Sequence, residues 1–307
     1  MTEINQDNFR EINLAALFKS VWQRKIFVMS VTFVFALAGV FYALSLSNVY
    51  TSQAILAPAS DDAQSALPKL GGMGGLASLA GINLSGGNSN RSTIALELIK
   101  TWGFLEKTAI KYDIIPQIYA AKSWSETTNE IIYDADIYDS KQKKWLIPDE
   151  NTPQELRAPT SWEVYEVFES LFSVSTNEET GFITIKVDHY SPAFAKQLLE
   201  ILVHEINEEI RSRDIKNLSQ RISYLKEQIK ETNIREMQSI FYELVREQTQ
   251  SLMLAEVSKE YALETISNAR VAEEKSKPSR AIIVIVITFL GFMLSVAYTL
   301  VSQISKK

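Results

Sequence analysis

The sequence predicts an α+β membrane protein: two transmembrane helices flank a periplasmic α/β base domain that carries a long antiparallel helical (coiled-coil) hairpin. Three observations predict this class. Ile26–Leu46 and Ala281–Val301 are uncharged apolar runs near the two ends of the chain. The region between them mixes alternating strand-like runs with helical patterns. From Pro192 to Glu260 there is no further glycine or proline, and apolar residues recur every three or four positions.

The two apolar runs have the length of a membrane crossing. Each contains 21 residues, and a helix of that length spans about 31 Å, close to the ~30 Å hydrocarbon core of a bilayer. A cleaved signal peptide is the alternative for the first run, because Ala43–Ser45 resembles a cleavage site. The run is long for a signal peptide and 25 residues precede it, so we expect a retained helix.

Charge sets the expected orientation. Of the net charge of −6, residues 1–25 contribute +1 and residues 302–307 contribute +2, which leaves −9 on the loop between the spans. The basic residues next to the first span and in the tail are Lys19, Arg24, Lys25, Lys306 and Lys307. By the positive-inside rule, we expect both termini in the cytoplasm and the loop in the periplasm of an inner-membrane protein. The acidic loop argues against nucleic acid as a partner.

The predicted segments follow from these boundaries. In chain order they are a cytoplasmic N-terminal segment (1–25), the first transmembrane helix (26–46), the base domain (47–191), the helical hairpin (192–260), a return strand with a proline-containing lead (261–280), the second transmembrane helix (281–301) and a cytoplasmic tail (302–307). A short amphipathic helix is expected within residues 4–22, with an extension of the first transmembrane helix as the alternative. The two cytoplasmic pieces are too short to hold a kinase or signalling domain.

The first part of the base begins with a strand. Residues 48–57 are rich in β-formers and alternate roughly in polarity. The glycine-rich segment 71–87 lacks the Gly-Lys-Ser/Thr of a phosphate-binding loop and is expected to be a flexible loop, with a packing surface between subunits as the alternative. Residues 92–113 have near-helical apolar spacing, and Gly103 is expected to interrupt that helix.

The second part of the base predicts a helix, a β-hairpin and another helix start. Residues 161–172 are expected to form a helix capped by Ser161. Its core-facing residues are expected to be Trp162, Tyr165, Phe168 and Phe172. Residues 173–188 predict a hairpin with its turn at 179–181. Ser191 and Pro192 then fit the N-cap and first position of the long helix.

The long helical stretch is expected to fold back on itself near Asn233, because Thr232 and Asn233 are weak helix formers at its middle. An antiparallel register centred there pairs Ile229 with Met237, Leu225 with Phe241 and Ile222 with Leu244. The predicted seam consists of Leu218, Ile222, Leu225, Ile229, Met237, Phe241 and Leu244. One straight rod is the alternative.

The second span carries small residues at a spacing of four. These are Gly291, Ser295 and Thr299, and small residues on one helix face allow close helix approach in lipid. We expect this stripe to pack against another helix; a chance occurrence is the alternative.

The loop shows no pattern of a catalytic, cofactor or metal site. There are two histidines, His189 and His204, and neither lies in a metal-binding spacing. The chain has no cysteine, so it has neither disulfides nor a thiol nucleophile. The five tryptophans are expected to be scattered and to lack adjacent carboxylates, so we expect core or interface positions rather than carbohydrate stacking. We therefore expect no enzyme activity and no cofactor.

The order of these elements resembles the Wzz-type chain-length determinants, or polysaccharide co-polymerases. It rests on VYTSQAILAP (49–58), FITIKVDHYSPAFAKQLLEILVHEIN (182–207) and the lead KPSRAIIV (277–284) into the second span. The resemblance is most specific at residues 48–58, 182–207 and 261–280. Pro278 and Arg280 stand at the family's motif before the second span, although family members often have more prolines there.

The resemblance implies a function. Such a protein would form a homo-oligomeric ring in the inner membrane and set how many repeat units a Wzy-type polymerase adds to a growing lipid-linked glycan, most often lipopolysaccharide O-antigen. A two-span extracytoplasmic sensor and an export adaptor acting through a partner chain are the alternatives. A glycan-modifying enzyme is disfavoured, because the sequence shows no site for one.

Overall fold

The computed structural model describes residues 22, 24–59, 87–149, 152 and 154–304. Apart from Trp22, the helix expected within residues 4–22 lies outside these described residues, and so does the glycine-rich segment up to residue 86. The chain divides into two compact units. One contains the helices near the two chain ends, and the other runs from Val49 to Lys275.

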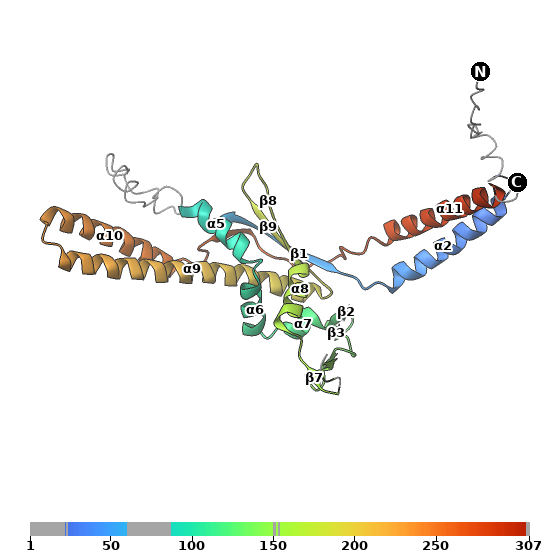
Figure 1. The fold of residues 1–307 in the computed structure, drawn as a ribbon, viewed down its shortest axis with the longest axis horizontal. Coiled ribbons are helices and arrows are strands. Elements are labelled where there is room, and N and C mark those ends of the chain that lie inside the picture. The colour runs from blue at the N-terminus through green and yellow to red at the C-terminus, as the bar shows by residue number, and fades with distance from the viewer. Residues whose placement is uncertain (1–21, 23, 60–86, 150–151, 153, 305–307) are drawn as a thin grey trace, which may run out of the picture. The chain divides into compact units, whose positions relative to one another are not determined.

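The first unit is an antiparallel helix pair, α2 (Lys25–Ser45) and α11 (Arg280–Ile304) (Figure 1). Both helices are long and apolar enough to cross a membrane, and only 17% and 11% of their most apolar windows are buried in the protein. A core helix of a soluble protein would be mostly buried. The apolar side chains that face outward here, such as Phe33, Phe41 and Phe289, therefore require an apolar surrounding.

The second unit is built on a four-stranded antiparallel sheet in the order β10-β1-β9-β8. Its strands are β1 (Tyr50–Pro58), β8 (Phe172–Thr176), β9 (Ile183–His189) and β10 (Leu263–Ser267). In β9 burial alternates along the strand, as expected for one face against a core. The strand at 48–57 and the hairpin at 173–188 are confirmed. Gly181 adopts a positive φ of 71° in the turn between β8 and β9, which explains a glycine there.

Short elements complete the base. The helices are α5 (Gly87–Leu98), α6 (Trp102–Lys111), α7 (Ile115–Tyr119) and α8 (Ser161–Leu171). Three small two-stranded sheets are formed by β2 (Ala121–Ser125) with β3 (Glu130–Tyr133), β4 (Tyr138–Asp139) with β5 (Lys144–Trp145), and β6 (Ile147–Pro148) with β7 (Leu156–Arg157).

Two details of these helices differ from the sequence prediction. Gly103 does not interrupt a helix: the break lies between Leu98 and Trp102, and Gly103 sits inside α6 with open space around it. The N-cap of α8 is Thr160 rather than Ser161, because Thr160 and Glu163 form a reciprocal capping box. The pattern Thr-x-x-Glu in the sequence was the signal for this cap.

The core-facing side of α8 also differs from the prediction. Phe168 and Phe172 are buried, as expected, and Tyr165 packs partly against the core. Trp162 is instead 52% exposed, because the buried stripe of α8 runs through Val164 and Phe168. Trp162 therefore lies on the outer face of the helix.

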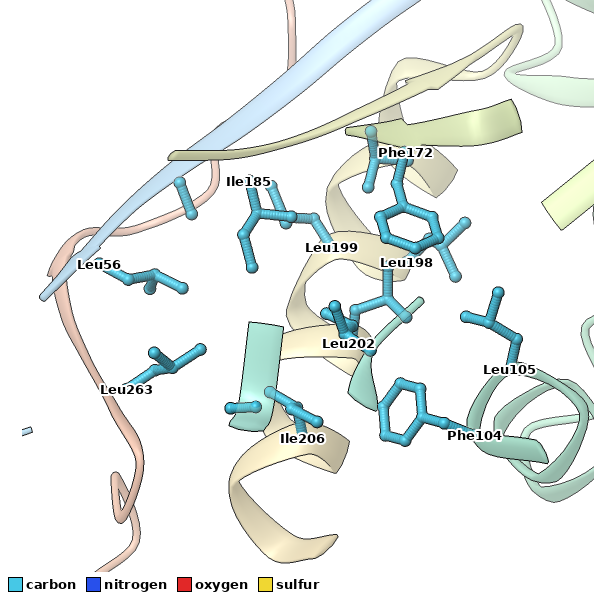
Figure 2. Packing of buried hydrophobic residues seen from close by; sticks show 14 of the residues in the cluster. Leu56, Phe104, Leu105, Phe172, Ile185, Leu198, Leu199, Leu202, Ile206 and Leu263 are labelled. Carbon is cyan, nitrogen blue, oxygen red and sulfur yellow. The ribbon is translucent and has the colours of Figure 1, made fainter. Parts of the chain in front are cut away.

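The core lies between the sheet and the first half of the long helix α9 (Pro192–Glu231). Ser191 caps this helix with its hydroxyl, and Pro192 occupies its first turn, as the sequence predicts. Figure 2 shows Leu198, Leu199, Leu202 and Ile206 of α9 between strand residues on one side and α6 on the other. The strand residues are Leu56, Ile185 and Leu263, and the α6 residues are Phe104 and Leu105. Full burial of each such side chain contributes roughly 1.5–3 kcal/mol.

The second half of α9 runs beside α10 (Arg235–Val257) as an antiparallel hairpin (Figure 1). The turn occupies Thr232–Ile234 and so includes Asn233. Gln238 closes the turn by donating hydrogen bonds to the carbonyls of Thr232 and Ile229, at 2.9 and 3.4 Å. At the other end of the hairpin, Arg211 donates to the Glu256 carbonyl at 3.2 Å.

Spin labels test this hairpin directly. Asn217 and Gln250 are exposed, and the chain has no cysteine of its own, so Asn217→Cys and Gln250→Cys accept labels without a background. In the hairpin their separation is close to an interhelical spacing of about 10 Å plus the label arms. One continuous helix would place them about 50 Å apart. A measured electron–electron distance above about 40 Å contradicts the hairpin.

Candidate functional site

Buried polar side chains gather at the junction of the α9–α10 hairpin with the base. Asn207 of α9 is 2% exposed. Its side-chain oxygen accepts from the backbone N–H groups of Ala262 and Leu263 at 2.8 and 2.9 Å. Its amide donates to the carbonyls of Leu263 and Val203 at 3.0 and 3.2 Å. Asn207 therefore fixes the chain leaving the hairpin, at the start of β10, to the helix that forms its first arm.

A buried carboxylate holds α9 to α6. Glu205 is 6% exposed. It accepts from Lys111 Nζ at 2.8 and 2.9 Å and from the Tyr112 hydroxyl at 2.7 Å. Burial by itself raises the pKa of Glu205, but the hydrogen bonds from Lys111 and Tyr112 outweigh it, and the net pKa is lowered. Burial and the hydrogen bond to Glu205 raise the pKa of Tyr112 to about 12. Near neutral pH the Tyr112 hydroxyl is therefore neutral and donates to a charged Glu205 carboxylate.

A second polar cluster joins α5 to the hairpin. Arg91 donates to Asp214 at 3.0 Å, and the Tyr261 hydroxyl donates to the same carboxylate oxygen at 2.9 Å. The Arg91 guanidinium also stands over the Tyr261 ring, 4.7 Å from its centroid. Asn207, Glu205 and Asp214 are not among the predicted site residues, because each contacts partners distant along the chain and no local pattern marks them.

His189 occupies the junction of β9 with α9. It is 2% exposed, its Nε2 lies 2.9 Å from the Gln117 carbonyl, and its Nδ1 accepts from the Ser191 N–H at 3.0 Å. These partners require a neutral ring with the proton on Nε2. Burial lowers the pKa of His189 to about 4, against the opposing effect of the bonds to Gln117 and Ser191.

This histidine predicts an acid-dependent loss of stability. The unfolded chain takes up the proton near the ordinary pKa of 6.5, whereas the folded chain does so near 4. Between these values the unfolded state binds more protons, so the stabilisation is complete above pH 6.5 and falls by about 3 kcal/mol as the pH drops to 4. Urea unfolding of the full chain in detergent micelles from pH 7.5 to 4 measures this fall.

The matched variant for this prediction is His189→Gln, which keeps a hydrogen-bonding side chain but does not titrate. Its stability is lower at pH 7.5, and its fall towards pH 4 is shallower than that of the unsubstituted chain. Acidic groups with lowered pKa values, including Glu163 at about 2, titrate equally in both proteins. Identical slopes in the two proteins rule out the role assigned to His189.

The predicted hairpin seam is buried unevenly. Leu218 and Ile222 are 9% and 8% exposed, whereas Met237, near the turn, is 38% exposed. The remaining predicted seam residues are half-buried: Leu225, Ile229, Phe241 and Leu244. Packing along the hairpin is thus tightest toward the base and loosens toward the turn.

The small residues of the second span face α2 of the same chain. Ser295 and Thr299 are 2% and 1% exposed, and their hydroxyls donate to carbonyls one turn back in α11. A Cβ added at Gly291 would overlap Phe35 of α2, and one added at Gly39 of α2 would lie 3.2 Å from Ile287. The stripe therefore lets α2 and α11 approach closely, and this face is already occupied within one protomer.

An arginine joins the two helices at each end of this pair. Arg280, the first residue of α11, donates to the Asn48 side chain at 3.0 Å and to the Leu46 carbonyl at 3.3 Å. Arg24 donates to Ser302 at 3.1 Å at the opposite end. Pro278, which follows a cis peptide bond, accepts through its carbonyl from the Arg280 N–H at 2.9 Å. The predicted motif residues thus lie where the chain turns into the second span.

The described residues contain no group of three histidine, aspartate or glutamate side chains placed to hold a metal ion. His204 lies on α9 with its side chain 60% exposed, and its Nε2 lies 3.8 Å from Glu205 Oε1.

Comparisons with known proteins were made for the whole chain. The family model "Wzz: Chain length determinant protein" matches residues 10–111, and the GNVR model, "G-rich domain on putative tyrosine kinase", matches residues 230–304. Together the two models account for more than half of the chain. A solved "full-length bacterial polysaccharide co-polymerase" is 12% identical, with a TM-score of 0.38, over 96% of this chain and 98% of that one. No curated protein matches the chain.

Proposed function

Because the chain belongs to the Wzz-type chain-length determinant family and is thereby a regulator of polysaccharide chain length, we propose that it acts without catalysis of its own, together with a Wzy-type polymerase. We further propose that its polysaccharide is lipopolysaccharide O-antigen. The observation that carries this proposal is the pair of family matches at both ends of the chain. They include both membrane-length helices, the adjacent strands β1 and β10, and the second arm of the hairpin.

The proposed location is the bacterial inner membrane. The helices α2 and α11 serve as the two spans, both termini lie in the cytoplasm, and the unit from Val49 to Lys275 lies in the periplasm. This orientation is supported by the basic residues beside the first span. We propose that the periplasmic part consists of a base at 47–191, a hairpin at 192–260 and a return strand at 261–280.

The proposed working form is a homo-oligomeric ring. The hairpin has large apolar side chains along α10 that the other described residues leave exposed: Ile240, Tyr242, Met253 and Val257 are 40–75% exposed. The small-residue stripe of α11 is used within the protomer. Association between protomers is therefore expected to come from the hairpin and base rather than from this stripe.

The proposed mechanism is positional. The polar junctions at Asn207, Glu205 and Asp214 hold the hairpin rigidly on the base, and a ring of such scaffolds holds the polymerase or the growing lipid-linked glycan for a defined distance or time. No proton or group transfer by this chain is required.

Deletion of the gene tests the proposal. Surface polysaccharide from the deletion strain, with related regulators also removed, is separated on a gel and compared with that of the same strain carrying the intact gene. We expect the favoured band of chain lengths to disappear and to return with the intact gene. An unchanged distribution of O-antigen lengths contradicts the proposed function.

A further inference from the structure

Two tryptophans distant along the chain form an exposed aromatic corner. Trp102 opens α6 and Trp162 lies in the first turn of α8, and their rings meet edge to face, 5.8 Å apart at 83°. Tyr165 extends the group, 5.3 Å from Trp162. Trp102 and Trp162 are 46% and 52% exposed. We call Trp102, Trp162 and Tyr165 the aromatic corner.

The rings of the aromatic corner are held in place from behind. Trp102 Nε1 donates to the Ser161 hydroxyl at 2.8 Å, and Ser161 in turn donates to Glu106. Trp162 Nε1 donates to Glu166 at 2.9 Å. Both indole N–H groups are therefore satisfied within the protein, and the surfaces left for a ligand are the ring faces.

Carboxylates surround this corner. Glu106 and Glu166 each use one oxygen, Oε1, in the bonds that orient the indoles. Their second oxygens have no hydrogen-bond partner among the described residues. Glu169 lies on the same exposed face of α8, seven residues after Trp162. The sequence prediction that the tryptophans are scattered and lack adjacent carboxylates is thus wrong for this pair, because folding unites α6 with α8.

We propose that the aromatic corner binds uncharged or amino-sugar units of a glycan. A pyranose ring presents a face of C–H groups that packs on an indole and a rim of hydroxyls that donate to carboxylates. The aromatic corner and its glutamates supply both. The acidic rim disfavours anionic lipid headgroups and acidic sugars. This assignment rests on the proposed function, for which it supplies a contact with the growing polymer.

Binding of defined oligosaccharides to the full chain in detergent micelles tests the assignment. The probes are chitohexaose and cellohexaose, with an oligogalacturonate of the same length as the anionic comparison. Saturation-transfer NMR and quenching of tryptophan fluorescence report binding. We expect one or both neutral probes to bind and the anionic probe to bind at least several-fold more weakly.

Substitutions then locate the site. The pair Trp102→Ala and Trp162→Ala is expected to weaken binding about tenfold or more. The pair Trp102→Phe and Trp162→Phe keeps flat rings and retains part of the affinity, which covers the case in which the alanine pair fails to fold. The Glu166→Gln variant keeps an oxygen that accepts from Trp162 Nε1. It is expected to bind the neutral probes more weakly, because the carboxylate charge that accepts from sugar hydroxyls is gone. Trp145→Phe changes a tryptophan that packs on Tyr138 outside the corner and leaves binding unchanged.

Two results overturn the assignment. One is equal binding of the neutral probes by the unsubstituted chain and by both tryptophan pairs. The other is no binding of either neutral probe by the unsubstituted chain. If chemical cross-linking in that case also shows a smaller assembly for the Trp102 and Trp162 variants, the aromatic corner is a contact between copies of the chain. Failure of the gene-deletion test is a separate result, because it leaves oligosaccharide binding to purified protein intact.

Discussion

Replacing Asn207 with leucine is expected to lower the free energy of unfolding by about 3–5 kcal/mol, because it leaves several buried backbone groups without partners. Asn207 satisfies the N–H groups of Ala262 and Leu263 and the Leu263 carbonyl with one side chain, inside a region from which water is excluded. Leucine has a similar volume, so the loss comes from hydrogen bonding and not from an empty cavity.

Asn217→Leu is the matched control for this substitution. Asn217 lies on the same helix but is exposed, so the change is expected to stay within about 0.5 kcal/mol. Urea unfolding of both variants in micelles measures the difference, and hydrogen exchange at Ala262 and Leu263 locates it. Equal free energies of unfolding for the two variants contradict the stabilising role of the Asn207 hydrogen bonds. In cells, the Asn207→Leu variant is expected to shift the polysaccharide ladder as the deletion does.

Replacing Gly291 with alanine is expected to weaken the pairing of α2 with α11 by about 1–3 kcal/mol, the usual cost of an overpacked interface. The new Cβ would overlap the Cβ and Cγ of Phe35 on the facing helix, and the Phe35 Cβ cannot move without its backbone. Cysteines placed at Phe27 and Tyr298, whose rings lie 5.5 Å apart, report the pairing through disulfide formation in membranes. The chain has no cysteine to interfere.

A graded series controls this experiment. Gly39→Ala brings its Cβ to 3.2 Å from Ile287 and is expected to have a smaller effect. Gly103→Ala, where nothing lies within 4 Å, leaves cross-linking unchanged and stabilises α6 slightly, as alanine does in a helix. Adding Phe35→Ala to Gly291→Ala removes two of the three close contacts and restores part of the cross-link. Undiminished cross-linking in the Gly291→Ala variant alone contradicts the close packing of the spans.

Much of the fold could be predicted because its signals are local. Alternating residues gave β1 and β9, Ser191 with Pro192 gave the start of α9, and the weak helix formers Thr232 and Asn233 marked the turn region. Each of these signals depends on neighbours within one or two turns of chain. The Thr160–Glu163 capping box was equally local and could have been found by the same means.

The polar junctions and the aromatic corner could not be predicted in this way. Asn207 meets the chain 55 residues later, and Glu205 meets Lys111, 94 residues earlier. Trp102 and Trp162 are joined only because α6 packs against α8. A lone asparagine or glutamate in a helix normally faces solvent, so the sequence alone predicts exposed positions for Asn207 and Glu205. Only the tertiary contacts show that they are buried.

The sheet order has a consequence for biosynthesis. β1 is made early in translation, yet its two neighbours are β9 and β10, and the latter ends at Ser267. One edge of β1 therefore stays unpaired until nearly the whole unit from Val49 to Lys275 has been produced. A nascent chain stalled before Leu263 would expose that edge to misassociation or proteolysis, so maturation of this protein is coupled to completion of its translation.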